Sequence, residues 1–97
     1  SMTLMEQMAN IGSEVGRAGK WLDKGNLKLA EGAFYRGLDL IDATIKSGRK
    51  GMPSRSCLLF ELCRARDLFS ESFLDKNFDN LKYIEKYFGQ FAKAIRR

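Results

Sequence analysis

The chain has 97 residues, of which 44% are hydrophobic and 30% are charged, and its net charge is +5 at neutral pH. This length and composition are typical of one soluble globular domain with a core of modest size. The chain contains no histidine, which excludes Ser-His-Asp triads, histidine acid–base chemistry and most zinc sites. We therefore predict a protein that is not an enzyme and that has no catalytic residue, metal or cofactor.

Targeting signals and disulfides are not indicated by the sequence. No apolar run approaches the roughly 20 residues needed to cross a bilayer, and the first residues lack the continuous apolar stretch of a signal peptide. We expect a cytoplasmic protein.

Cys57 and Cys63 would be separated by about 9 Å along a helix, too far for a disulfide within it. We expect both thiols to be free, and buried or half-buried.

The first helix is predicted over about 3–24. Its apolar face recurs at steps of three and four residues, through Leu4, Met8, Ile11, Val15, Ala18 and Leu22. A stripe of glycines, Gly12, Gly16 and Gly19, lies beside that face. Each glycine costs a helix roughly 1 kcal/mol relative to alanine, so the stripe indicates the close approach of another helix. Gly25 is expected to end this helix and Asn26 to cap the next one.

The second helix is predicted over about 27–47, with an apolar arc that covers about half of its circumference. Its small residues Ala30, Ala33 and Gly37 are expected to face the glycine stripe. The first two helices would then form a tight antiparallel hairpin. Gly48 is the expected end of the second helix.

Two further helices are predicted, over about 53–73 and 78–96. Pro53 is favoured in the first turn of a helix, and Asn77 is a candidate cap before the last helix. Because amphipathic helices joined by short loops pack as bundles, we predict an all-α, four-helix up-down-up-down bundle in a single domain over 1–97. The alternative architecture is two stacked helical hairpins of the tetratricopeptide kind.

Arg66 is the most unusual charged residue of the third helix. With Leu59 at the centre of the apolar face, a step of seven residues returns Arg66 to within about 20° of that centre. A charged group there must be paired or must reach water. We predict a buried ion pair that fixes the register of the bundle, with Glu14, Asp39 or Asp42 as the partner. Binding of an anionic ligand and simple exposure at a looser helix end are the alternatives.

Basic residues gather at one end of the predicted bundle. In an up-down bundle the loop between the second and third helices lies at the same end as the end of the fourth helix. Seven cations then form a basic pole: Lys46, Arg49, Lys50, Arg55, Lys93, Arg96 and Arg97. The rest of the chain has ten basic and twelve acidic residues, so the pole holds the whole positive excess. It fits either a polyanion site or solvated helix ends.

One segment carries a resemblance to known helix pairs. From Trp21 to Leu38 the chain resembles a tetratricopeptide hairpin, with Trp21, Gly25, Ala30 and Phe34 in similar order. The segment is also similar to the helix pair of HEPN domains, four-helix bundles of bacterial toxin–antitoxin and nucleotidyltransferase partner systems. HEPN members that cleave RNA use an arginine and a histidine, so this resemblance implies a non-catalytic relative.

The whole chain is similar to small bacterial four-helix proteins in which a set of short motifs recurs. The matching segments are Glu14–Arg17, Gly25-Asn26, Arg36–Asp42 and Glu61–Arg64. This resemblance assigns no activity.

Two functions follow as hypotheses. The first is a non-enzymatic protein–protein interaction module, either a homodimer or the partner of another protein. Its contact surface would include Trp21, Tyr83 and Tyr87, which lie beside the main apolar stripes and suit either a core rim or an interface. The alternative is weak nucleic-acid or polyanion binding through the basic pole.

Overall fold

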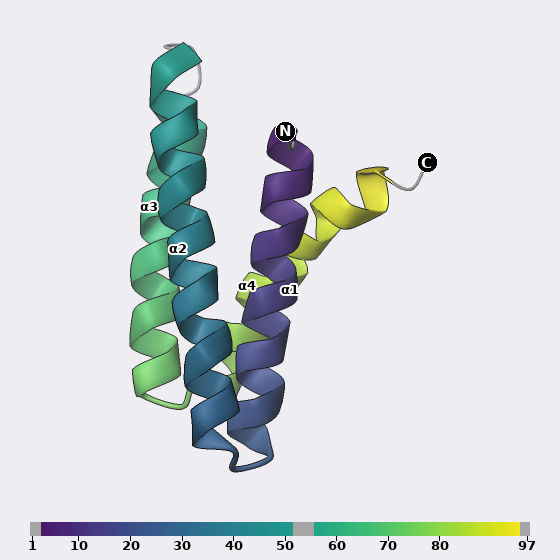
Figure 1. Ribbon diagram of the computed structural model, residues 1–97, viewed down its shortest axis with the longest axis vertical. Coiled ribbons are helices and arrows are strands. Elements are labelled where there is room, and N and C mark those ends of the chain that lie inside the picture. The colour runs from purple at the N-terminus through teal and green to yellow at the C-terminus, as the bar shows by residue number, and fades with distance from the viewer. Residues whose placement is uncertain (1–2, 52–55, 96–97) are drawn as a thin grey trace.

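The computed structural model describes residues 3–51 and 56–95, and side chains over 3–47 and 59–94. This part of the chain contains four helices and no strands: α1 (Leu4–Asp23), α2 (Leu27–Gly51), α3 (Ser56–Leu74) and α4 (Phe78–Ile95). Consecutive helices run in opposite directions (Figure 1). The predicted all-α, four-helix up-down-up-down bundle is therefore confirmed. Within the described ranges, no helix combines the length and apolarity that a membrane crossing requires.

The turns after α1 and α3 have the same construction. Gly25 and Lys76 occupy the left-handed region, with φ of 78° and 55°. The backbone N–H of the following residue, Asn26 or Asn77, donates to the carbonyl five residues earlier, at 2.9 and 2.8 Å. Each asparagine side chain then accepts the backbone N–H three residues later, at 3.2 and 3.1 Å. The caps predicted at Asn26 and Asn77 are thus confirmed, and the chain uses one turn design twice.

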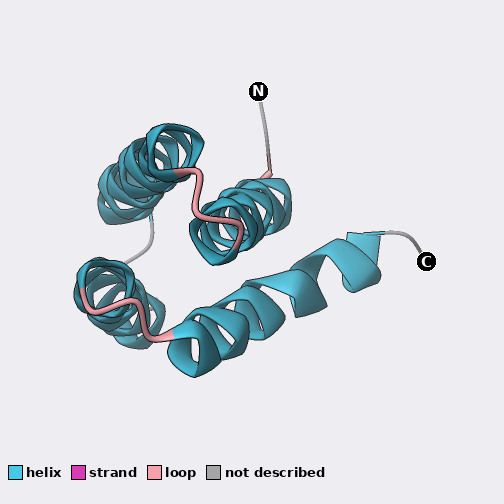
Figure 2. Ribbon diagram, turned by 90° about the horizontal axis from the view of Figure 1, so that it is seen from below, coloured by secondary structure: helices cyan, strands magenta, loops and turns pink. Residues whose placement is uncertain are grey.

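α1 lies between α2 and α4 and contacts both along its length (Figures 1 and 2). Its glycine stripe faces α4, so the predicted contact with the small residues 30, 33 and 37 of α2 is wrong. A Cβ added at Gly12 would lie 2.9 Å from the Cβ of Phe88, which is fully buried. Gly37 instead leaves room for the ring of Phe69 on α3. Glycine is used in both places because a phenylalanine packs against the backbone of the opposite helix.

The core forms where the four helices meet. It includes Met8, Ile11, Val15 and Ala18 from α1, Ala30, Ala33, Phe34 and Ile41 from α2, Leu62, Phe69 and Phe73 from α3, and Leu81, Ile84 and Phe88 from α4. The rings of Phe34 and Phe73 stack with centroids 4.2 Å apart, joining α2 to α3. The backbone of α3 approaches α2 and α4 closely at fewer positions than the backbone of α1 does.

The C-terminal end of α2 differs from the prediction. α2 continues through Gly48 to Gly51, so the predicted end at Gly48 is wrong. A single glycine costs a helix only about 1 kcal/mol, and the arginine and lysine that follow it are good helix formers. Pro53 lies outside the described residues.

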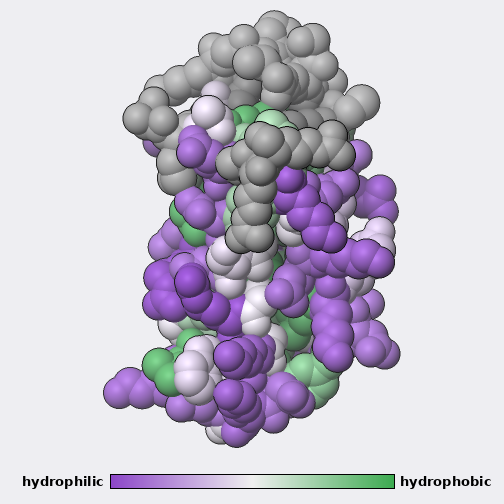
Figure 3. Space-filling view, turned by 90° about the vertical axis from the view of Figure 1, so that its right-hand side faces the viewer, coloured by the Kyte–Doolittle hydropathy of each residue, from purple (hydrophilic) through white to green (hydrophobic). Residues whose placement is uncertain are grey.

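The last helix diverges from the other three. α4 crosses behind α1, and its C-terminal end points away from α2 and α3 (Figures 1 and 2). Seen from the right-hand side of Figure 1, most of the coloured surface is hydrophilic (Figure 3).

Candidate functional site

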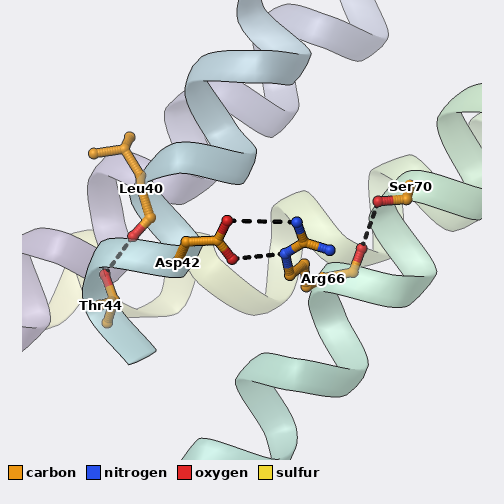
Figure 4. Close-up of polar contacts among 5 residues, drawn as sticks. All are labelled: Leu40, Asp42, Thr44, Arg66 and Ser70. Carbon is orange, nitrogen blue, oxygen red and sulfur yellow. Dashed lines mark hydrogen bonds and ion pairs between the residues drawn. The ribbon is translucent and has the colours of Figure 1, made fainter. Parts of the chain in front are cut away.

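Arg66 bridges α2 and α3 at the surface. Its Nε–H donates to Asp42 Oδ1 at 2.6 Å, and its Nη2 donates to Oδ2 at 3.4 Å (Figure 4). That hydrogen bond raises the pKa of Arg66. The two side chains are 39% and 52% exposed, so Asp42 is the partner but the predicted burial of the pair is wrong. Glu14 does not pair with Arg66, and Asp39 is exposed without an ion pair to any described residue.

The position of the apolar face explains why Arg66 is not buried. Leu62, Phe69 and Phe73 form the buried side of α3, whereas Leu59 is only half-buried. Ser72 is also buried, on the flank away from Arg66, so the centre of the buried face lies about 20° from Leu62 and Arg66 lies about 60° from that centre. At that angle the guanidinium reaches water, and an exposed pair of this kind contributes roughly 0–1 kcal/mol.

Glu14 is the buried carboxylate of the described structure, with 9% of its surface exposed. Its Oε2 accepts a hydrogen bond from Arg36 Nε at 3.2 Å and lies 3.4 Å from Arg17 Nη1. Both arginine side chains are mostly exposed, so they reach down from the surface to an anion at the edge of the core. Oε1 is buried and has no hydrogen-bond partner among the described residues. This cluster joins α1 to α2, and it has the geometry of a structural clamp.

Tyr87 joins α4 to α3. Its hydroxyl donates to Glu61 Oε1 at 2.6 Å, and burial together with this hydrogen bond raises the pKa of Tyr87 to about 12. Tyr87 and Tyr83 line a groove of about 410 Å³ between α3 and α4.

Trp21 is half-buried against the core, and Lys24 Nζ lies 5.4 Å from the centroid of its ring. Of the three predicted contact aromatics only Tyr83, which is 67% exposed, presents most of its surface to solvent.

The basic pole is only partly described. Lys46 and Lys93 are exposed, as the prediction requires. The side chains of Arg49, Lys50, Arg55, Arg96 and Arg97 lie outside the described residues, so the pole stays a prediction.

Sequence reasoning missed the outward side of α3. Phe60 is 71% exposed and Leu74 is 75% exposed, and the residues between them on the same helical face are exposed as well. The face follows steps of four, three, four and three residues, and we call it the α3 outer face: Phe60, Arg64, Asp67, Glu71 and Leu74. Its signal was present in the sequence, because these two apolar residues fall opposite the buried stripe.

The cysteines add little to the site. Cys63 is a free thiol and is exposed, so the expectation of burial or half-burial is wrong for it. It lies on the flank of α3 that faces solvent rather than on the buried stripe. Cys57 has no described side chain.

In the described ranges no group of three or more cysteine, aspartate or glutamate side chains is arranged to hold a metal ion. No protein-family model, curated protein or solved structure matches the chain. Function must therefore be inferred from the surfaces of the chain itself.

Proposed function

We propose that this protein is a non-enzymatic interaction module of the cytoplasm that forms a homodimer through the α3 outer face. One observation carries the proposal: Phe60 and Leu74, the two most exposed large hydrophobic residues of the described chain, are 71% and 75% exposed on one side of α3. Burying a leucine or phenylalanine side chain stabilises a complex by about 1.5–3 kcal/mol. The two apolar groups lie about 21 Å apart along α3, one at each end of the α3 outer face, so a partner must offer an apolar contact at both ends.

The spacing of the α3 outer face favours a second copy with its α3 antiparallel. Asp67 lies seven residues from both Phe60 and Leu74. A two-fold axis at Asp67 therefore places each Phe60 against Leu74 of the second copy. Arg64 and Glu71 lie three and four residues to either side of the axis, so they pair reciprocally. A two-fold interface requires this kind of self-complementarity.

The proposed interface is small. One helix face buries less than the roughly 800 Å² per partner of a standard interface, and association also carries a large entropic cost. In addition, the two Asp67 carboxylates meet at the axis, an unfavourable pair that the nearby Arg64 side chains only partly offset. We therefore expect dimers with a micromolar dissociation constant.

Sedimentation equilibrium between about 1 and 200 µM, which spans micromolar affinity, tests the proposal. The wild type should approach the mass of a dimer, the double variant F60S/L74S should remain monomeric, and D67N should dimerise more tightly than the wild type. The matched control is L27S/Y35S, which removes two exposed apolar side chains of α2 and should dimerise normally. The α3 homodimer is wrong if the control loses the dimer equally or if the wild type stays monomeric.

In the second version of the proposal, the module binds another protein instead of a second copy of itself. A wild type that is monomeric throughout would leave only the version in which another protein is the partner, and that version needs a binding partner to be found. That role matches the non-catalytic HEPN-like resemblance of the sequence, in which the helical bundle acts together with a second protein.

A further inference from the structure

We infer that the outward side of α4 binds single-stranded nucleic acid. Three lysines, a tyrosine and a glutamine share this side of the helix, and all of them are exposed. Tyr83, Lys86, Gln90 and Lys93 follow steps of three and four residues, and Lys82 lies beside Tyr83 one turn before Lys86. We call this surface the α4 lysine face: Lys82, Tyr83, Lys86, Gln90 and Lys93.

The lysine charges of this face are available to a ligand. None of the three lysines forms an ion pair with a described residue; the ion pairs of the described chain join Glu14 to Arg17 and Arg36, and Asp42 to Arg66. Two acidic residues of α4 adjoin the face: Asp79 is exposed one turn before Tyr83 on the same side of the helix, and Glu85 lines the same groove as the lysines. Glu85 is directed toward α1, because its Oε2 lies 2.5 Å from the position of a Cβ added at Gly16. Three lysines against these two carboxylates leave the face a positive excess of one charge, which attracts phosphate groups.

The shape of the face fits a polymer that lies along it. The lysines border an open groove of about 600 Å³, which Glu85, Tyr87 and Gly89 also line. A Cβ added at Gly89 would meet nothing within 4 Å, so the groove is open over the backbone. The lysines extend over twelve residues, about 16 Å along the helix. Several phosphates of one strand can therefore contact them together.

Tyr83 distinguishes nucleic acid from other anionic partners. Its ring is 67% exposed, and an aromatic ring beside lysines is the combination that single-strand binding proteins use to stack bases while they neutralise phosphates. A helix that binds an anionic membrane needs leucine, phenylalanine or tryptophan on the inserted side, and the α4 lysine face has none. Lys93 also belongs to the basic pole, but the other residues of the face do not. The α3 outer face shares no residue with the α4 lysine face, but the two surfaces adjoin, because Arg64 and Tyr83 line the same groove between α3 and α4.

Fluorescence anisotropy with labelled dT12 and rU12 tests the charge requirement. Each phosphate contact to a single strand contributes about −0.7 to the slope of log K against log salt. Removing two contacts with K82A/K86A should therefore make the loss of affinity between 50 and 200 mM salt about sevenfold smaller than in the wild type. The control K24A/K28A removes the same charge at the turn between α1 and α2, where both lysines are exposed. It should keep the salt dependence of the wild type.

The tyrosine variants test the stacking requirement. Y83A should lower affinity by about fivefold or more, whereas Y83F keeps the ring and should bind as the wild type does. Y35A removes an exposed tyrosine of α2 and should have no effect. Circular dichroism confirms that each variant is folded. The inference is overturned if neither oligonucleotide binds at 50 mM salt, or if K24A/K28A matches K82A/K86A. It is also overturned if Y83A binds as the wild type does, since the site would then recognise any polyanion, such as heparin or an acidic protein.

Discussion

Replacing the glycines of α1 by alanine measures how closely α1 and α4 approach. Each replacement should gain about 1 kcal/mol of helix propensity, so the differences between the variants report the contacts of the new Cβ. At Gly19 that atom would lie 3.8 Å from the Cβ of Leu81, an ordinary contact. G19A should therefore be more stable than the wild type by about 1 kcal/mol, and its Tm should rise by about 4–8 °C.

Gly12 should respond in the opposite way. There the new Cβ would lie 2.9 Å from the Cβ of Phe88 and 3.3 Å from its carbonyl carbon, atoms that move only if the two helices separate. Overpacking of this kind costs about 1–3 kcal/mol. Because the propensity gain is common to both variants, G12A should be less stable than G19A by about 1–3 kcal/mol. Relative to the wild type it should lose up to about 2 kcal/mol.

Urea unfolding followed by circular dichroism gives the free energies, and an unchanged m-value shows that the unfolded states are comparable. G16A should fall between the other two, because its new Cβ would meet the Oε2 of Glu85 at 2.5 Å, the movable end of a side chain. The packing of α1 on α4 is described incorrectly if G12A is as stable as G19A.

Three further variants test local features of the structure. R66A should lower the free energy of unfolding by at most about 1 kcal/mol, because its pair with Asp42 is half-exposed; a loss of about 3 kcal/mol, the cost of breaking a buried pair, would contradict the structure. K76G should stabilise the protein by about 1 kcal/mol, because a φ of 55° is unfavourable for any residue with a Cβ, and an unchanged or lower Tm would refute this. The pKa of Tyr87 is raised from 10.0 to about 12 by burial and by its bond to Glu61, so the stability that this hydroxyl contributes is present below pH 10 and is lost as the pH rises from 10 toward 12. Absorbance at 295 nm should accordingly show a component near pH 12 that disappears in Y87F, and ionisation of Tyr87 near pH 10 would contradict the bond.

The sequence predicted the helices well because their signals are local. The apolar steps of α1 and the cap residues Asn26 and Asn77 depend only on neighbours in the chain. The glycine stripe of α1 was recognised as a close contact, but its partner was not. Periodicity places residues on one face of their own helix, whereas the choice between α2 and α4 depends on the fit of Phe88 and Phe69, which only the packed structure reveals.

The charged residues were harder to place for a related reason. The prediction placed Leu59 at the centre of the buried face of α3, although Leu59 lies about 60° from the buried Leu62. Because of this error, the ion pair of Arg66 was expected in the core, whereas it lies at the surface. Glu14 was named only as a partner for Arg66, although it follows Ile11 by three residues and precedes Ala18 by four, within the apolar side of α1. That spacing was the available signal for the one carboxylate that the described structure buries.

Disulfide trapping at position 67 tests the antiparallel α3 homodimer most directly. At a two-fold axis, helices about 8–10 Å apart place the two residue-67 Cα atoms about 4–5 Å from each other, within disulfide range. Cys63 of one copy lies eight residues from Cys63 of the other in this register, about 12 Å along the helices. With Cys57 and Cys63 replaced by serine, D67C should form a covalent dimer under mild oxidation, whereas C57S alone, which keeps the exposed Cys63, should not. A monomeric D67C protein, or equally efficient cross-linking through Cys63, would contradict the proposed interface.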